Sequence, residues 1–386
     1  MFTTALLLLA PAALCAALAP LPEPPVPATS SRLASSNVFW RGQQSVQGDV
    51  YPCIRIPSLL RAGRGVLLAF AECRMATGDG CLPANVSMSG PTDVCSRRSL
   101  DSGASWGPLT VAVRNAHQNT PVYDAVRGAV VLSLNLLDAA NSNAQAVSLD
   151  DGLTWGPLQP LAGFLGALDG AAAGPGVGLQ LSAGHPVAPG RLLFIGHRGA
   201  YVEDVVWLSD DGGATYRVAA TPAGRTLPLM DEAQLVELSN GDVLANMRNH
   251  VKQPGGGGAL RAVALSRDGG ATFGPIAYDP QLAEPVCMAS IVRGDDGGVY
   301  FSNPGQATGR VSGRVRRAEA CAGLDCAWGN RTLVVAEGAP FAYSCLAPLN
   351  RTHVGLLWET GAPGCSASSN ACLQVFSAVP VALLQG

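Results

Sequence analysis

The stretch Ser99-Leu-Asp-Ser-Gly-Ala-Ser-Trp106 is the first of four copies of one short pattern, and this repetition decides the fold. The other copies are Ser148-Leu-Asp-Asp-Gly-Leu-Thr-Trp155, Ser209-Asp-Asp-Gly-Gly-Ala-Thr-Tyr216 and Ser266-Arg-Asp-Gly-Gly-Ala-Thr-Phe273. Their starts are 49, 61 and 57 residues apart, and a degraded fifth copy ends about one period later, at Asp325-Cys-Ala-Trp328. A recurring period of this length is the mark of a repeat architecture, so each copy marks one structural unit.

Each copy has the chemistry of a hairpin turn. The Asp can accept hydrogen bonds from the backbone of the turn, the Gly supplies a positive φ, and the aromatic side chain is expected to pack beneath the turn. Short apolar runs of strand length lie between the copies, and none is long enough for a long helix. These runs are Val66–Ala71, Val130–Leu137, Leu192–Ile195, Leu235–Leu238, Val243–Ala245, Ala262–Leu265 and Val354–Trp358. The pattern predicts an all-β protein, a six-bladed β-propeller.

The composition excludes several other classes. The chain has 386 residues, of which 48% are hydrophobic and only 14% charged, and it contains 46 Gly and 28 Pro, which favours turns over long helices. Its net charge is −3 and it has no block of Lys or Arg, so nucleic-acid binding through a basic face is not expected. Beyond the N-terminus no run of about 18 apolar residues could span a bilayer as a helix.

The N-terminus has the character of a secretion signal. An apolar run from Ala5 to Ala19 is followed by a Pro-rich stretch, and its length suits a signal-peptide core better than a membrane span. We therefore expect a signal peptide at 1–19, a Pro/Ser-rich linker at 20–36 and the propeller at 37–380. An uncleaved anchor, which would associate the protein with a membrane, is the alternative.

The cysteines favour an oxidising compartment. Cleavage of the signal leaves ten, two pairs are spaced for local disulfides, and three bracket one polar loop. The pairs are Cys321/Cys326 and Cys365/Cys372, and the loop carries Cys73, Cys81 and Cys95. Closely spaced cysteine pairs of the metal-binding type and interleaved histidines are absent, so no metal and no cofactor are expected. Glycosylation sequons at Asn85, Asn330 and Asn350 agree with the secretory pathway.

A series of ordered motifs adds to the repeat. It comprises Arg55-Ile-Pro57, Leu68-Ala-Phe-Ala-Glu72-x-Arg74, Gly174-Pro-Gly176-Val-Gly-Leu-Gln180, Asp231-Glu232-x-Gln234, Asn246-Met-Arg248-Asn249, Phe301-Ser-Asn-Pro304 and Ala342-Tyr343-Ser344. With the repeat, which matches the Asp box, the chain resembles the sialidases over roughly residues 37 to 378, most closely the lysosomal sialidase of animals and bacterial exo-sialidases. The resemblance implies release of terminal sialic acid from glycoproteins, oligosaccharides and gangliosides, in a lysosomal or extracellular setting.

A sialoside carries a carboxylate on its anomeric carbon, so its site needs fixed positive charge. Arginine holds a carboxylate bidentately and stays charged at any working pH. The resemblance assigns a carboxylate-binding triad to Arg55, Arg248 and Arg310, although Arg314, Arg316 and Arg317 lie close to the third. It assigns to Glu359 the carboxylate that orients the first arginine.

The same electrostatics argue for a tyrosine nucleophile. An acid attacking a carbon that bears a carboxylate would meet a repulsion of about 4 kcal/mol at 4 Å and an effective dielectric near 20. A neutral tyrosine avoids this repulsion but needs a base, because its pKa is near 10. Sialidases are the known tyrosine exception among retaining glycosidases, and Tyr343 with Glu232 as its base matches that pair.

The general acid is less well defined. The resemblance places an Asp shortly after Arg74, a residue expected to contact the sugar hydroxyls, and Asp79 stands there. An insertion from Gly80 to Pro91 follows, and Asp93 beyond it is the alternative acid.

These residues predict retaining hydrolysis by an exo-α-sialidase that acts without a cofactor. Two other hypotheses remain. One is a trans-sialidase with the same site, and the other is a catalytically silent propeller that binds sialoglycans. A silent protein would be expected to have lost Tyr343, Glu232 or an arginine of the triad, so the presence of all of them favours the enzyme.

Overall fold

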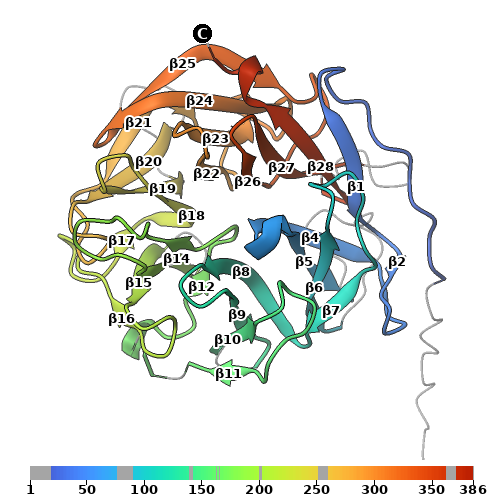
Figure 1. Cartoon of the computed structure of the whole chain (residues 1–386), viewed down its shortest axis with the longest axis horizontal. Coiled ribbons are helices and arrows are strands. Elements are labelled where there is room, and N and C mark those ends of the chain that lie inside the picture. The colour runs from blue at the N-terminus through green and yellow to red at the C-terminus, as the bar shows by residue number, and fades with distance from the viewer. Residues whose placement is uncertain are drawn as a thin grey trace, which may run out of the picture.

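The computed structural model describes residues 19–75, 90–138, 142–161, 163–164, 166–199, 202–250, 260–361 and 371–385. In these residues six sheets of four or more strands stand around a central axis, and a two-stranded hairpin lies beside them (Figure 1). The helical elements of this part of the chain are three short 3-10 turns. The predicted all-β, six-bladed propeller is confirmed.

The first three blades follow one another along the chain, and each is a sheet of antiparallel strands. Blade 1 consists of β4 (Cys53–Arg61), β5 (Leu67–Arg74), β6 (Thr92–Ser99) and β7 (Thr110–Val113). Blade 2 consists of β8 (Ala116–Asp124), β9 (Ala129–Leu136), β10 (Asn143–Ser148) and β11 (Gln159–Pro160). Blade 3 consists of β12 (Ala172–Ala173), β13 (Leu179–Gln180), β14 (Leu192–Arg198), β15 (Glu203–Ser209), β16 (Arg217–Val218) and β17 (Leu227–Pro228).

The other three blades complete the ring. Blade 4 consists of β18 (Met230–Glu237), β19 (Val243–Asn249), β20 (Leu260–Ser266) and β21 (Ala277–Ala283). Blade 5 consists of β22 (Ser290–Arg293), β23 (Val299–Pro304), β24 (Gly313–Ala322) and β25 (Asp325–Val334). Blade 6 consists of β26 (Ser344–Asn350), β27 (His353–Thr360), β28 (Leu373–Pro380) and, from the start of the chain, β1 (Ala34–Trp40). Each of the seven apolar runs predicted as strands falls largely within one of these strands.

The ring is closed by strands from the two ends of the chain. β1 pairs antiparallel with β28, with Ser36 opposite Phe376, so the outermost strand of the last blade precedes the first blade in sequence. The remaining strands, β2 (Gln43–Gln44) and β3 (Val50–Tyr51), form the separate hairpin. Strand structure thus begins at Ala34, within the stretch expected to be a linker.

The four repeat copies connect the third strand of blades 1 to 4 to the fourth, and they share one hydrogen-bond pattern. In the first copy the amide of Gly103 donates to Ser99 Oγ at 2.8 Å, and Asp101 accepts from the amide and hydroxyl of Ser105 at 2.9 and 2.5 Å. The Ser105 hydroxyl is the main reason why the pKa of Asp101 falls to about 2. The same bonds recur from Ser148, Ser209 and Ser266.

The aromatic residue of the repeat joins neighbouring blades. Trp106 of blade 1 packs edge-on against Phe376 of blade 6 at a centroid distance of 5.6 Å, and Trp155 of blade 2 packs against Phe70 of blade 1 at 5.8 Å. The hydroxyl of Tyr216 in blade 3 donates to Gln145 of blade 2 at 2.6 Å. These side chains were expected to pack beneath their own turns. In the structure they also contact the neighbouring blade and so connect adjacent sheets.

The degraded fifth copy occupies the equivalent position in blade 5 with different chemistry. The β24–β25 turn is closed by the predicted disulfide Cys321–Cys326, and Trp328 on β25 donates its indole N–H to Asp279 of blade 4 at 2.9 Å. A disulfide and a tryptophan therefore stand where blades 1 to 4 have a Ser-Asp turn.

The remaining cysteines divide into bonded and free ones. Cys73 bonds to Cys95, and Cys53 and Cys372 are also disulfide-bonded, whereas Cys287 and Cys345 are free and buried. Cys81 and Cys365 lie outside the described residues, as does all of the predicted signal peptide except Ala19. No helix in the described part of the chain is long and apolar enough to cross a membrane.

The repeat predicts a large cost for a side chain at Gly103. Its φ is +90°, and a Cβ there would lie 2.1 Å from the ring of Phe376. Gly103→Ala should lower the free energy of unfolding by about 2–5 kcal/mol, the sum of a left-handed backbone and an overpacked contact. Chemical denaturation measures this change. Gly48→Ala is the matched control, because Gly48 has a φ of +95° with nothing within 4 Å, and its cost should be smaller by about 1–3 kcal/mol. Equal costs would contradict the packing role.

Candidate active site

The predicted site residues from four blades meet at one end of the central channel. Arg55 lies near the start of β4, Glu232 near the start of β18 and Arg248 near the end of β19. Tyr343 directly precedes β26, and Arg310 lies in the β23–β24 connection. Inner strands of neighbouring blades start at the same end of a propeller channel, which is why residues nearly 300 positions apart become neighbours.

Tyr343, Glu232 and Arg248 form a buried hydrogen-bonded cluster. The Tyr343 hydroxyl donates to Glu232 Oε1, and Arg248 Nη1 donates to Glu232 Oε2 and, at 3.2 Å, to the Tyr343 oxygen. Burial first, and then the charge of Glu232, raise the pKa of Tyr343 well above its ordinary value, while Arg248 and Arg55 oppose the rise. Tyr343 is therefore a neutral phenol that donates to a carboxylate, the ground state expected of a nucleophile with a paired base.

Arg55 is held by Glu359 of the last blade. Its Nε and Nη2 donate to the two carboxylate oxygens at 3.2 and 2.8 Å. The amides of Ile56 and Tyr343 donate to the same carboxylate at 2.8 and 3.3 Å. Both partners are buried, so this bidentate pair fixes the first arginine against the chain segment that carries the tyrosine.

Arg310 also lies beside the Tyr343 ring. Its guanidinium carbon lies 5.4 Å from the centroid of the Tyr343 ring, and that of Arg55 lies 4.9 Å from it. Arg310 Nη2 donates to the carbonyl of Val286 at 3.2 Å, and no carboxylate among the described residues forms an ion pair with it.

The three arginines that compete with Arg310 in the sequence point to other partners or lie farther along the blade. Arg317 on β24 pairs with Asp296, and Arg316 donates to the carbonyl of Gln281. Arg314, also on β24, lies opposite Asn303 of the neighbouring strand β23. Of the four candidates, the structure brings Arg310 to the tyrosine.

Arg74 at the end of β5 binds the neighbouring carboxylate of Glu72, with Nε and Nη2 at 2.8 and 2.6 Å from Oε2. The amide of Gln118 donates to the other oxygen of Glu72 at 2.8 Å. Burial raises the pKa of Glu72, but Arg74, His117 and the Gln118 amide outweigh it and hold the pKa below its ordinary value. Glu72 faces Arg55 across the β4–β5 pairing, so Arg74 belongs to the same rim of blade 1.

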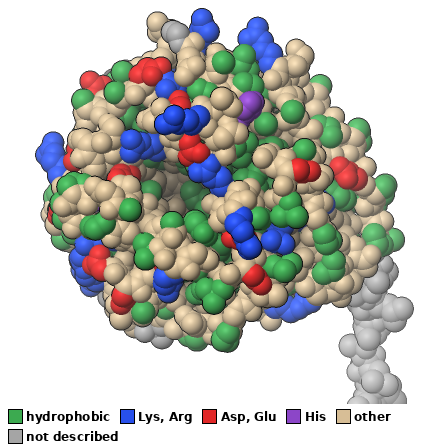
Figure 2. Space-filling view, viewed as in Figure 1, with side chains coloured by type: hydrophobic (Ala, Val, Ile, Leu, Met, Phe, Trp, Pro, Cys, Tyr) green, Lys and Arg blue, Asp and Glu red, His purple; other side chains and the backbone are tan. Residues whose placement is uncertain are grey.

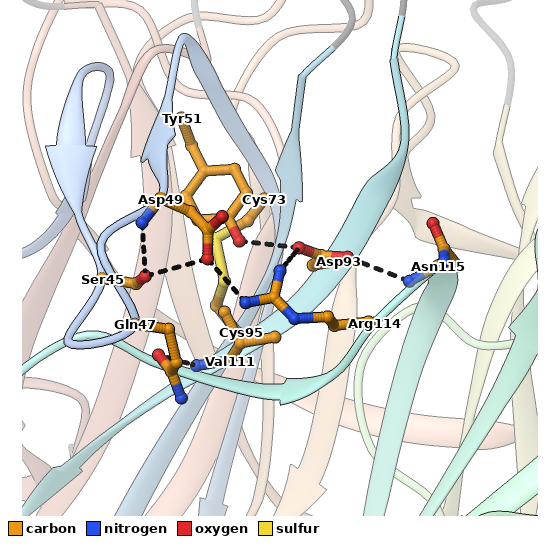
Figure 3. The surroundings of a disulfide bond; sticks show 10 residues. All are labelled: Ser45, Gln47, Asp49, Tyr51, Cys73, Asp93, Cys95, Val111, Arg114 and Asn115. Carbon is orange, nitrogen blue, oxygen red and sulfur yellow. Dashed lines mark hydrogen bonds and ion pairs between the residues drawn. A yellow bond between two sulfur atoms is a disulfide. The ribbon is translucent and has the colours of Figure 1, made fainter. Parts of the chain in front are cut away.

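The proposed acid Asp79 lies outside the described residues, whereas the alternative, Asp93, has a structural environment. Its carboxylate accepts from the Tyr51 hydroxyl at 2.7 Å, the Asn115 amide at 2.9 Å and Arg114 at 3.2 Å. Figure 3 shows Asp93 between Tyr51 and Arg114, beside the disulfide of blade 1. These bonds join β6 to the β7–β8 connection and to the β2–β3 hairpin, so this aspartate connects segments of the scaffold.

Backbone strain gathers at the site. Ile56, Glu232 and Val286 have φ values of +63°, +35° and +60°, a region that costs side chains energy, most of all β-branched ones. The pairing registers of β4 with β5 and of β18 with β19 also shift at Ile56 and Glu232. Such irregularities re-aim side chains next to functional sites. The sequence offers no sign of them, because nothing local marks these residues as turn formers.

A second group of acids, which sequence reasoning missed, lies behind Glu232. Asp231 is 3.6 Å from His197 and 3.5 Å from His250, and burial raises its pKa. Asp204 on β15 is fully buried, and neither carboxylate oxygen has a hydrogen-bond partner within the described residues. Burial, followed by the charges of Asp231 and Glu232, raises the pKa of Asp204 well above its ordinary value.

A cavity of about 630 Å³ occupies the other end of the channel, beside the ends of β4, β18 and β26. Figure 2 shows this face, which is hollowed near its centre and carries arginine and acidic side chains around the hollow. Arg61 there is paired with Asp295, and Glu237 accepts a hydrogen bond from Ser182, so both side chains already have partners within the protein. The strained backbone and the cluster around Tyr343 lie at the opposite end. Among the described residues, no group of three or more His, Cys, Asp or Glu could hold a metal ion.

Asp204 gives a pH-dependent prediction. Between its pKa in the unfolded chain and its raised pKa in the fold, the folded protein holds a proton that the unfolded chain releases, so stability falls as the pH rises through that window. Asp204→Asn, which cannot ionise, should leave the free energy of unfolding near wild type at pH 4 and raise it relative to wild type by about 1–3 kcal/mol at pH 7.5. Denaturation at the two pH values measures this. A pH-independent difference would contradict the buried, protonated state.

Comparison with known proteins agrees with this geometry. The chain is 30% identical over 357 residues to a sialidase of Micromonospora viridifaciens, covering 81% of this chain and 50% of the relative. It is 30% identical over 275 residues to Sialidase-4 of Mus musculus, covering 62% and 53% of the two chains. The chain therefore spans about half the length of these curated relatives. No protein-family model matches it.

Solved structures show the same fold. The NanB sialidase of Streptococcus pneumoniae superposes with a TM-score of 0.72 at 16% identity, over 91% of this chain and 71% of that one. The intramolecular trans-sialidase of Ruminococcus gnavus superposes with a TM-score of 0.71 at 17% identity, over 91% and 98%. The sequence relatives are named sialidases and the solved structures share the propeller fold, so the chain is similar to the sialidase family in sequence and in fold.

Proposed function

We propose that the protein is an exo-α-sialidase that hydrolyses terminal α-linked sialic acid with retention of configuration. The observation that carries this proposal is the donation of the Tyr343 hydroxyl to Glu232 while the guanidinium groups of Arg55 and Arg310 face the same ring. A neutral nucleophile with its base, surrounded by positive charge, suits an anomeric carbon that carries a carboxylate.

In the proposed mechanism Arg55, Arg248 and Arg310 bind the substrate carboxylate. The Tyr343 oxygen bonds to the anomeric carbon as its proton passes to Glu232, and the glycosidic C–O bond breaks while Asp79 protonates the leaving oxygen. Water then attacks the same carbon and gives its proton to Asp79. The Tyr343–carbon bond breaks, and Glu232 returns the proton to the phenol. Two displacements leave the released sialic acid with the configuration of the substrate.

The proposed substrates are sialylated glycoproteins, oligosaccharides and gangliosides, in which the sialic acid is terminal. The proposed location is the secretory pathway, with a lysosomal or extracellular destination. The disulfides of the fold support an oxidising compartment of this kind.

Tyr343→Phe tests the nucleophile directly. Loss of the phenolic oxygen should lower kcat/KM for a fluorogenic sialoside by roughly 10³-fold or more, because a residue that acts together with its base cannot be replaced by solvent. The control is Tyr278→Phe on β21, which removes a half-buried hydroxyl from a strand away from the channel and should change kcat/KM less than twofold. NMR of the first product formed should show the α-anomer.

The outcomes of this experiment separate the alternatives. A folded wild type that binds sialic acid but releases none from sialyl-lactose would overturn hydrolysis in favour of a binding protein. Formation of a new sialoside with an added acceptor, in place of free sialic acid, would identify a trans-sialidase. Equal rates for wild type and Tyr343→Phe would overturn the role of Tyr343.

The identity of the acid can be tested with leaving groups. A poor leaving group needs protonation and an activated aryl group does not, so Asp79→Asn should lower kcat/KM for sialyl-lactose roughly 10²–10⁴-fold and for the aryl sialoside far less. Asp93→Asn should instead lower the melting temperature, with similar effects on both substrates. Because the proposed acid must be protonated, the wild-type optimum should lie below pH 7, and an optimum above pH 8 would contradict this scheme.

A further inference from the structure

A further Arg–Glu pair lies beside the active site and has no part in the mechanism above. Arg261 on β20 and Glu284, directly after β21, are both completely buried. Arg261 Nη1 donates to Glu284 Oε2 at 2.5 Å. Neither side chain is hydrogen-bonded to Tyr343 in the part of the chain that the structure describes. Both bind β19 and the β21–β22 connection, so they can position residues of these two segments.

Glu284 holds the backbone on both sides of the pair. Its Oε2 accepts from the amide of Asn249 at 3.1 Å, and its Oε1 accepts from the amide of Cys287 at 2.9 Å. Asn249 directly follows Arg248, so this carboxylate fixes the end of β19 from which the second arginine projects. The bond to Cys287 closes the connection that begins at Glu284 itself.

Arg261 fixes the same two segments through other atoms. Its Nε donates to Asn246 Oδ1 on β19 at 2.8 Å, and its Nη1 donates to the carbonyl of Cys287 at 3.0 Å. Cys287 is thus held at its amide by Glu284 and at its carbonyl by Arg261. Val286 directly precedes Cys287; its φ of +60° is strained, and its carbonyl accepts the hydrogen bond of Arg310.

This arrangement links two of the three arginines in the cluster. Glu284 reaches Arg248 through Asn249, and both members of the pair reach Arg310 through Val286 and Cys287. Cys287 also packs with Tyr343 and Ile56 in one small buried group. A fully buried ion pair rarely adds net stability compared with a well-packed apolar pair, so its geometry is the better explanation of its presence.

We propose that Arg261 and Glu284 are positioning residues that hold Arg248 and Arg310 in register around Tyr343, so that both can bind one substrate carboxylate. The inference deepens the proposed sialidase function and rests on it. A displacement of about 1 Å in a positioned group can cost roughly 10²-fold in rate, so loss of the pair should lower kcat/KM and weaken recognition of the substrate carboxylate.

The test uses the paired variant Arg261→Gln/Glu284→Gln, because a single change would leave a buried charge without its partner and destabilise the fold. The full chain is assayed for KM and kcat with an aryl sialoside, and for inhibition by free sialic acid and by its methyl ester, which lacks the carboxylate charge. We expect the Ki of sialic acid to rise at least tenfold, kcat/KM to fall at least tenfold, and the Ki of the ester to change less than threefold. Arg261→Lys, which keeps the charge but not the fork of donors, should give an intermediate Ki.

The control removes a comparable ion pair at the other end of the channel. Arg317 on β24 and Asp296 in the β22–β23 turn are also nearly buried, and Arg317 Nη2 lies 2.7 Å from Asp296 Oδ2. Arg317→Gln/Asp296→Asn should lower the melting temperature but leave the ratio of the two Ki values at the wild-type level. A purely structural role of the Arg261–Glu284 pair would make the two paired variants behave alike, and that result would overturn the proposal.

Hydrogen exchange keeps this test separate from the proposed function. The amides of Asn249 and Cys287 should exchange at least tenfold faster in Arg261→Gln/Glu284→Gln and at the wild-type rate in the control.

If wild type binds sialic acid without hydrolysing it, the enzyme proposal fails, and the Ki ratio still decides the positioning role. If wild type does not bind it, amide exchange decides alone: faster exchange supports the proposal and unchanged exchange overturns it. If the paired variant does not fold, the Ki ratio of Arg261→Lys decides in the same way.

Discussion

The carboxylate of Glu359 is the contact on which both the ring and the site depend. It lies on β27 of the last blade and binds the side chain of Arg55 and the amide of Ile56 on the first. It also accepts from the amide of Tyr343, the residue proposed as nucleophile. One carboxylate of the last blade therefore joins that blade to the first and fixes both Arg55 and the backbone of Tyr343.

The cost of this arrangement is concentrated in a few backbone positions. Ile56 and Val286 are β-branched residues at positive φ, and Glu232 sits at a register shift in its sheet. Regular inner strands would alternate their side chains and send neighbours to opposite faces. The irregular positions re-aim the side chains and carbonyls that Arg55, Arg310 and Tyr343 need. The inter-blade contacts of the repeat turns, such as Trp106 on Phe376, give the scaffold the rigidity to hold such strain.

Much of the fold and part of the site could be predicted from the sequence, because both depend on local sequence patterns. The four copies of the repeat predicted the blades, and the motifs around Arg55, Arg248 and Tyr343 predicted which residues meet in the site. The motif glutamine Gln234 proved to be a link between blades, accepting from Ser290 and Ile291. The roles of Arg261, Glu284 and Asp204 could not be predicted, since their partners come from separate strands and no motif marks them. Nor could the sequence pattern predict that a disulfide takes the place of the Ser-Asp turn in blade 5.

The balance of charge around Tyr343 supports an anionic substrate. Arg55 is neutralised by Glu359 and Arg248 by Glu232, each at hydrogen-bond distance. Arg310 has a carbonyl as its recorded partner and no carboxylate among the described residues. A neutral sugar would leave that third guanidinium without a counter-charge in a partly buried place, whereas one carboxylate would complete the set. The acids behind Glu232 have other surroundings: burial raises the pKa of Asp204 well above its ordinary value, and Asp231 lies near Arg248, at 3.8 Å, and two histidines. Within the described part of the chain Arg310 has no carboxylate partner, and the proposed sialoside would supply a carboxylate on the carbon that Tyr343 would attack.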